Sequence, residues 1–260
     1  MWDDEAFTYF MCRQGLEHLN ACVCHDYNPW LYYLQVKLAL SVLGDGGLRS
    51  VSLLWGLLLL PLGYAWLRAR TSPHRALAGL ALLAVSPTLV YFSQEARVYS
   101  FLFLAMPTAL VLFARLVDRP TLGSLALSAG ASVVCVFSHY LSLVLIPTQL
   151  LWCALHPRRA YPALLSPLCA LALFLCELPV FRYQSSVLEL TRGVWEEPTP
   201  RAILRSLLIL GSGPDYSWPI LHYAACALFG LSLILMARSL RPMEDLCREL
   251  FTLLDRKSVV

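Results

Sequence analysis

Charged residues are scarce in this chain. They make up 14% of the 260 residues, whereas a soluble domain usually carries about 25%. The net charge of +3 is also too small to argue for binding to nucleic acid. Hydrophobic residues reach 58%, and the mean hydropathy is +0.62. This composition argues against an ordinary soluble domain and predicts a protein of the membrane.

The chain also lacks a disulfide framework. Five of its nine cysteines lie in apolar segments, where cysteine is an ordinary small hydrophobic residue. These five are Cys135, Cys153, Cys169, Cys176 and Cys226. Cys22 and Cys24 have neither zinc-finger nor redox spacing. A disulfide that involves Cys12 remains an open alternative.

Apolar residues come in blocks of roughly 17–22 residues, each long enough to cross about 30 Å of hydrocarbon as a helix. Seven spans are predicted: Val51–Trp66, Ala76–Phe92, Val98–Phe113, Leu122–Phe137, Leu141–Leu155, Tyr161–Phe181 and Ile220–Met236. A shorter apolar helix over Trp30–Leu43 should lie along the interface and end at Gly44. The sequence thus predicts an all-α polytopic bundle over residues 50–240. The predicted chain also has an outer loop with a juxtamembrane helix (1–49), a second outer loop (about 182–219) and a cytoplasmic tail (241–260).

Arginine supports this order of crossings. Clusters at residues 68–75, 115–119, 158–159 and 238–241 fall at alternate turns. Because positive charge accumulates in cytoplasmic loops, these turns are predicted to be cytoplasmic. The N-terminal residues and the turn that carries Arg97 are then on the outer face. No signal peptide precedes them, so either an upstream membrane helix is missing from this sequence or the Trp30–Leu43 segment inserts into the membrane. We expect the missing helix.

Two polar clusters interrupt the apolar pattern on the outer face. Asp3-Asp4-Glu5 opens the chain, and Gln94-Glu95-Ala96-Arg97 joins two membrane-length segments. Charges at such a junction are expensive unless they serve a function, and the planar fork of arginine suits a phosphate. We therefore expect Arg97 to bind a lipid-linked phosphate. An internal pair with Glu95, or simple snorkelling of Arg97, is the alternative.

Further polar residues fall in the same outer loops. Carboxylates at a membrane surface can act as a general base or bind a hard divalent cation, although acids at the start of a chain are often only solvated. His139 lies at the next outer turn, where it is either a donor to phosphate or a polar cap. The aromatic residues Trp30, Tyr32 and Tyr33 fit an interfacial belt equally well.

The order of these motifs resembles the membrane glycosyltransferases of the GT-C type. Asp4-Glu5-Ala6 is followed by Pro29 with Leu31-Tyr32-Tyr33-Leu34, then by the segment from Ser86 to Tyr99, and finally by His139-Tyr140. The resemblance runs from Trp2 to about Leu155, and the Ser86–Tyr99 segment is its most specific part. The chain is similar to bacterial family-39-like enzymes, kin of protein O-mannosyltransferases and aminoarabinose transferases.

The resemblance implies that a sugar moves from a polyprenyl-phosphate donor to a lipid, glycan or protein acceptor at the outer face of a bacterial plasma membrane. Asp4 and Glu5 match the catalytic acids of the family, with Asp4 as the principal one, and Arg97 matches its arginine near the lipid phosphate. The other implied residues are Tyr99, His139 and Tyr140 near the phosphate, and His25, Asp26, Asn28 and Tyr32 in the substrate loop. Asp4 and Asp26 could hold Mg²⁺ or Mn²⁺. However, Asn28 stands where the family often has histidine, and an asparagine side chain offers no nitrogen ligand.

Two rival functions stay open at this point. A transporter or flippase of a lipid-linked substrate would use the same arginine but would not need Asp4. A truncated or diverged membrane scaffold would use the polar clusters only for structure. The substitution Asp4→Asn separates an enzyme, which loses turnover and keeps lipid binding, from a transporter, which keeps both.

Overall fold

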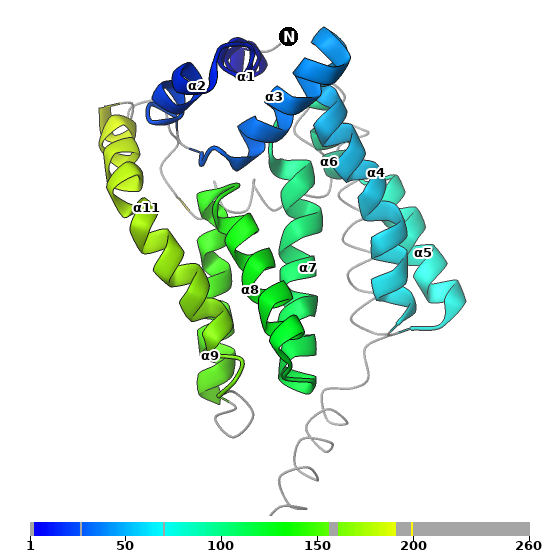
Figure 1. The fold of residues 1–260 in the computed structure, drawn as a ribbon. Helices are drawn as coiled ribbons and strands as arrows, with labels where there is room; N and C mark the ends of the chain where they lie inside the picture. Colours follow the sequence, from blue (N-terminus) through cyan, green and yellow to red (C-terminus); the bar gives the residue numbers. More distant parts are fainter. Residues whose placement is uncertain (1–2, 27, 70, 156–160, 191–198, 200–260) are drawn as a thin grey trace, which may run out of the picture. The chain divides into compact units, whose positions relative to one another are not determined.

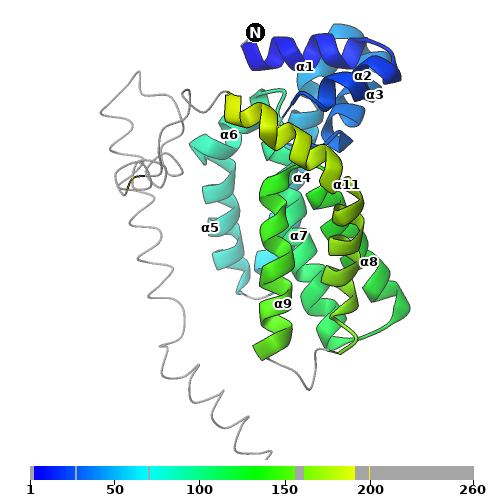
Figure 2. The same ribbon diagram turned by 90° about the vertical axis from the view of Figure 1, so that its left-hand side faces the viewer.

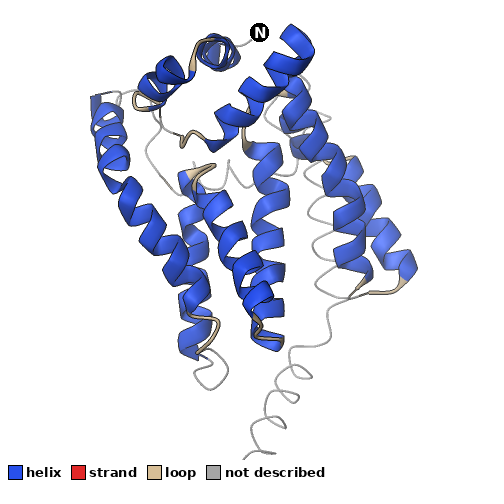
Figure 3. Cartoon of the chain, in the orientation of Figure 1, coloured by secondary structure: helices blue, strands red, loops and turns tan. Residues whose placement is uncertain are grey.

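The computed structural model describes residues 3–26, 28–69, 71–155, 161–190 and 199. Every regular element in these ranges is a helix (Figure 3), so the prediction of an all-α fold is confirmed for this part of the chain. The chain divides into two compact units, residues 1–85 with 89–197 and residues 86–88 with 198–260. The first unit contains all of the residues of the candidate site described below.

Three helices form the N-terminal part of this unit: α1 (Asp3–Arg13), α2 (Leu16–Val23) and α3 (Leu31–Leu43). In both views α1 and α2 lie across one end of the longer helices (Figures 1 and 2). Glu5, Thr8 and Cys12 of α1 are buried. They recur every three or four residues and therefore form one buried stripe of the helix. The outer loop predicted for residues 1–49 is therefore mostly helical.

α3 and α4 (Gly47–Arg68) are joined by the short 3-10 helix η1 (Gly44–Gly46). Gly44 has a φ of +61°, a conformation that glycine adopts without steric cost. Gly47 allows the two helices to approach closely, since a Cβ there would lie 2.3 Å from the carbonyl oxygen of Ala39. The glycine-rich turn thus ends the apolar helix at Gly44, as the sequence predicts.

The remaining helices are α5 (Pro73–Ala84), α6 (Pro87–Gln94), α7 (Tyr99–Asp118), α8 (Leu122–Val136), η2 (Tyr140–Val144), α9 (Leu145–Leu155) and α11 (Leu165–Leu190). Among them α7, α8, α9 and α11 alternate in direction along the unit (Figures 1 and 2). Ser72 caps α5 with Pro73 in its first turn, and Thr121 forms a capping box with Ser124 at α8. A bend of 52° separates α5 from α6. The predicted Ala76–Phe92 span is therefore a broken one, since Pro87 cannot continue the hydrogen bonds of α5.

Three stretches are long and apolar enough to cross a membrane by length and composition: Leu31–Arg68, which joins α3 and α4, Tyr99–Asp118 and Leu165–Ser186. The bent pair α5–α6 adds a fourth if it is counted as one span, whereas Leu122–Val136 and Tyr140–Ala154 are apolar but shorter. The described residues thus give three or four candidate spans, fewer than the seven predicted. The predicted span Ile220–Met236 lies outside the described residues.

The α4–α5 and α7–α8 turns, next to Arg68 and Arg119, lie at one end of the unit. The α6–α7 and α8–η2 turns lie at the other end, with α1 and α2 (Figure 1). Leu53, Leu54 and Leu57 on α4 are at least half exposed, which suits a helix that faces lipid. The described helices are therefore compatible with a membrane protein.

The second predicted outer loop begins later than expected. α11 continues through Arg182 to Leu190, so the first residues of the predicted 182–219 loop are helical. Residues 191–198 and 200–260, which include the rest of that loop and the predicted tail 241–260, lie outside the described residues.

Candidate functional site

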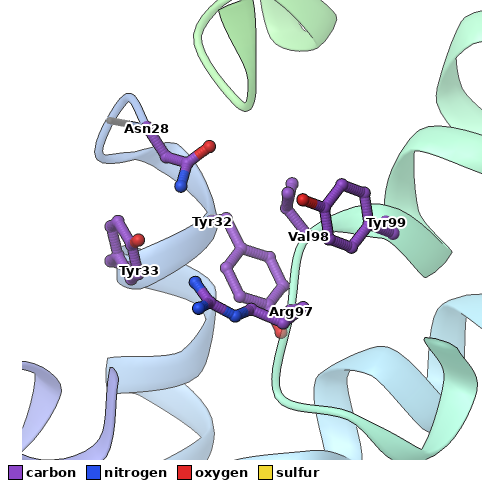
Figure 4. Close-up of a pocket in the computed structure, with 6 residues that line it drawn as sticks. All are labelled: Asn28, Tyr32, Tyr33, Arg97, Val98 and Tyr99. Carbon is purple, nitrogen blue, oxygen red and sulfur yellow. The ribbon is translucent and has the colours of Figure 1, made fainter. Parts of the chain in front are cut away.

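A pocket lies between the start of α3 and the start of α7 (Figure 4). It is small, with a cavity volume of about 10 Å³, and is lined by Asn28, Tyr32, Tyr33, Arg97, Val98 and Tyr99. The Arg97 side chain extends from the α6–α7 turn toward Tyr33 on α3 (Figure 4). Four residues predicted from the sequence as site residues, Asn28, Tyr32, Arg97 and Tyr99, thus meet in one pocket. The pocket combines a cation with aromatic and amide side chains.

The backbone of Arg97 is fixed by a chain of buried hydroxyl groups. Ser52 on α4 donates its Oγ hydrogen to the Arg97 carbonyl at 3.0 Å, and the Tyr32 hydroxyl lies 2.8 Å from the same Oγ. A serine hydroxyl has one hydrogen, so Tyr32 must be the donor in the second bond. Ser52 is fully buried and Tyr32 is 2% exposed. Sequence reasoning missed Ser52, because a lone serine in an apolar helix carries no signal of its partners.

Glu5 holds the same turn from the other side. Its carboxylate accepts hydrogen bonds from Nε and Nη2 of Arg49, at 2.9 and 2.7 Å, and from the backbone N–H of Ala96 at 3.0 Å. Glu5 is 1% exposed. A general base needs an accessible lone pair near the proton that it takes. These contacts favour a structural role for Glu5 over the catalytic role predicted from the sequence.

Asp4, the other predicted catalytic acid, is described only in its backbone, in the first turn of α1. It directly precedes Glu5, whose side chain contacts the residue before Arg97. The backbone of Asp4 is therefore near the α6–α7 turn. A catalytic role for its side chain stays a prediction.

Asp26 is held beside the pocket by neutral donors on two of the lining residues. The Tyr33 hydroxyl donates to Asp26 Oδ2, and Asn28 Nδ2 lies 3.4 Å from the same oxygen. Within the part of the chain that the structure describes, no group of three or more His, Cys, Asp or Glu side chains could hold a metal ion. The Asp4 side chain is outside the described part of the structure, so the Mg²⁺ or Mn²⁺ site predicted at Asp4 and Asp26 stays a prediction, and no step below is routed through a metal.

His139 lies beside the pocket. Its ring centroid is 5.7 Å from that of Tyr99, and its Nδ1 accepts the N–H of Leu141 at 3.0 Å, which caps η2. Burial lowers the pKa of His139; Arg97 lowers it further, and Asp26 opposes both. The ring is therefore neutral at pH 7, with Nδ1 as the acceptor and the hydrogen on Nε2. His139 therefore caps η2, which is one of the two roles predicted from the sequence. Its Nε2–H can donate to a ligand, which is the other role.

Two predicted residues contact α11 and do not line the pocket. The Tyr183 hydroxyl lies 3.5 Å from His25 Nδ1, and the Tyr140 hydroxyl donates to Gln184 Oε1 at 2.5 Å. Gln184 also donates to the carbonyl of Val23 at 2.7 Å and is 2% exposed. His25 and the Gln184–Val23 bond thus help to tie α11 to the end of α2, and Tyr140 ties α11 to η2. The cost of a polar residue in an apolar helix could have drawn attention to Gln184.

The alternative of an internal Glu95–Arg97 ion pair is not seen. The ion pairs among the described residues are Arg13–Asp45 and Arg49–Glu5. Glu95 and Arg97 are joined instead through the backbone, where Arg97 N–H donates to the Glu95 carbonyl at 2.8 Å. This bond shapes the turn and leaves the position of the Arg97 side chain to its surroundings in the pocket.

Comparisons of the chain with models of protein families, with curated proteins and with solved structures found no match. A function for the chain must therefore be argued from the residues of this site.

Proposed function

We propose that this protein is a membrane glycosyltransferase of the GT-C type. It would move a sugar from a polyprenyl-phosphate donor to a lipid, glycan or protein acceptor at the outer face of the membrane. The observation that carries the proposal is the position of Arg97, at the end of a membrane-length helix, in a pocket that also contains Asn28, Tyr32 and Tyr99. In this proposal Arg97 lies at the membrane surface, where the phosphate of a lipid-linked donor also lies, and a guanidinium can bind that phosphate through two parallel hydrogen bonds.

The proposed reaction uses the residues of the chain alone. Asp4 takes the proton of the acceptor hydroxyl, and the acceptor oxygen attacks the anomeric carbon of the sugar. The bond between that carbon and the phosphate oxygen breaks, and polyprenyl phosphate leaves with the electron pair. Arg97, with the Nε2–H of His139, stabilises the charge that develops on the phosphate. Tyr99 and Asn28 line the space beside it.

The decisive experiment measures donor binding and turnover separately in purified protein reconstituted in lipid. The probe is a polyprenyl-phosphate hexose. Arg97→Ala should weaken its binding about 10- to 100-fold, because one charge-assisted hydrogen bond is worth about 1.5–3 kcal/mol. Arg97→Lys keeps the charge but loses the paired contact, so its turnover should fall strongly. Arg75→Ala, at the opposite end of the unit, is the matched control and should bind as the wild type does.

Asp4→Asn distinguishes the proposed enzyme from its rivals. An enzyme that uses Asp4 as a base loses turnover and keeps donor binding, whereas a transporter keeps both. Donor binding at the wild-type level in Arg97→Ala would contradict the phosphate role of Arg97. Snorkelling would then explain this arginine, and a scaffold would become the better interpretation.

A further inference from the structure

We propose that Glu5 is a positioning residue, which holds the α6–α7 turn so that Arg97 faces the pocket. Three donors converge on its buried carboxylate, two from Arg49 on α4 and one from the backbone of Ala96 in the turn. Glu5 and Ala96 are 91 residues apart in sequence. The carboxylate therefore connects α1, α4 and the turn at a single point. The link to donor binding rests on the function proposed above.

The geometry explains why a carboxylate is suited to this position. The turn between Gln94 and Tyr99 is not helical, so its N–H groups need partners from elsewhere. Ala96 is fully buried, and its N–H finds the Glu5 carboxylate in place of water. Arg49 fixes the orientation of the Glu5 carboxylate through a paired contact with its two oxygens. One oxygen is thereby aimed at the N–H of Ala96.

The two-residue segment Ala96–Arg97 is held at both ends. Glu5 accepts the N–H of Ala96, and Ser52 donates to the carbonyl of Arg97. Two anchors on successive residues fix the direction in which the Arg97 side chain leaves the backbone. Loss of the Glu5 anchor frees one end of this segment and leaves the Arg97 side chain itself unchanged.

Glu5 and Arg49 differ in burial, so substitutions of the two residues should have different effects. This difference distinguishes a positioning role of Glu5 from a simple salt bridge. The Glu5 side chain is 2% exposed, whereas that of Arg49 is 52% exposed. In Glu5→Leu the guanidinium of Arg49 can turn to water. In Arg49→Leu the carboxylate of Glu5 stays buried without its cation, so this variant should be the less stable of the two. It should nevertheless keep a carboxylate oxygen beside Ala96.

The experiment is hydrogen exchange, read by mass spectrometry, on the full chain in lipid nanodiscs. In Glu5→Leu, exchange of the segment from Glu95 to Val98 should become about tenfold faster, the equivalent of one hydrogen bond, while α7 keeps its protection. In Glu5→Gln the amide oxygen can still accept from Ala96, so exchange should lie between wild type and Glu5→Leu. Glu17→Leu, which removes an exposed acid from α2, is the control and should change nothing.

Unchanged exchange of this segment in Glu5→Leu would overturn the proposal. The same proteins are then tested for binding of the polyprenyl-phosphate hexose. Weaker binding in Glu5→Leu, with partial rescue in Glu5→Gln, supports positioning of Arg97. Faster exchange with unaltered donor binding would overturn the positioning role. If the wild type binds no donor, the proposed function fails, and the exchange data still decide whether Glu5 holds the turn.

Discussion

The hydrogen-bonded chain from Tyr32 through Ser52 to the Arg97 carbonyl leads to a testable prediction about the free energy of unfolding. Ser52→Ala leaves the buried Tyr32 hydroxyl without its acceptor and removes one bond from the Arg97 carbonyl. An unsatisfied buried group costs about 1–3 kcal/mol, although side-chain bonds in membrane bundles average about 0.6 kcal/mol. We therefore expect Ser52→Ala to lower the free energy of unfolding by about 1–3 kcal/mol.

Tyr32→Phe provides the discriminating step. In wild-type protein it removes one hydrogen bond and should cost about 0.5–1.5 kcal/mol. In the Ser52→Ala background the tyrosine hydroxyl has already lost its acceptor, so its removal should be neutral or stabilising. The assay is unfolding by SDS titration in mixed micelles, followed by tryptophan fluorescence, with the exposed Ser41→Ala as the control. An equal cost of Tyr32→Phe in both backgrounds, within about 0.3–0.5 kcal/mol, would refute the proposed chain of donors.

Three further predictions concern pH, packing and topology. Because the pKa of His139 is lowered in the folded protein, its contribution to stability is complete above its unfolded pKa of about 6.5 and is lost as the pH falls through the folded value. Thermal unfolding between pH 7.5 and 5 should show this loss of stability. The substitution His139→Gln should reduce the loss. A Cβ on Gly56 would lie 2.1 Å from Ser93 Oγ, so Gly56→Val should lower the melting temperature more than Gly130→Val, where the Cβ meets nothing within 4 Å. In a cysteine-free background, Ser72→Cys should resist an impermeant thiol reagent in intact cells, and labelling there would contradict the assigned orientation.

Much of the local structure is determined by the sequence itself. Apolar blocks of membrane length predict helices, because the backbone must satisfy its own hydrogen bonds in lipid. Gly44 and Pro87 mark two of the breaks, since glycine permits a positive φ and proline cannot continue a helix. The polar cluster that ends at Arg97 is also visible as an interruption between two such blocks. These features depend on neighbours in the chain, and composition and spacing are enough to predict them.

The roles of the individual polar residues were decided only by the tertiary structure. Glu5 and Asp4 are adjacent acids that look equivalent in the sequence, yet the Glu5 carboxylate is taken up by Arg49 and Ala96. Ser52 carries no local signal, and its importance comes from the carbonyl that α4 brings it to. Tyr140, which is predicted near the phosphate, donates to Gln184 on α11, a partner 44 residues away that the sequence does not indicate. A buried hydrogen bond depends on distance and direction between groups far apart in the chain, and the periodicity of one helix does not contain that information.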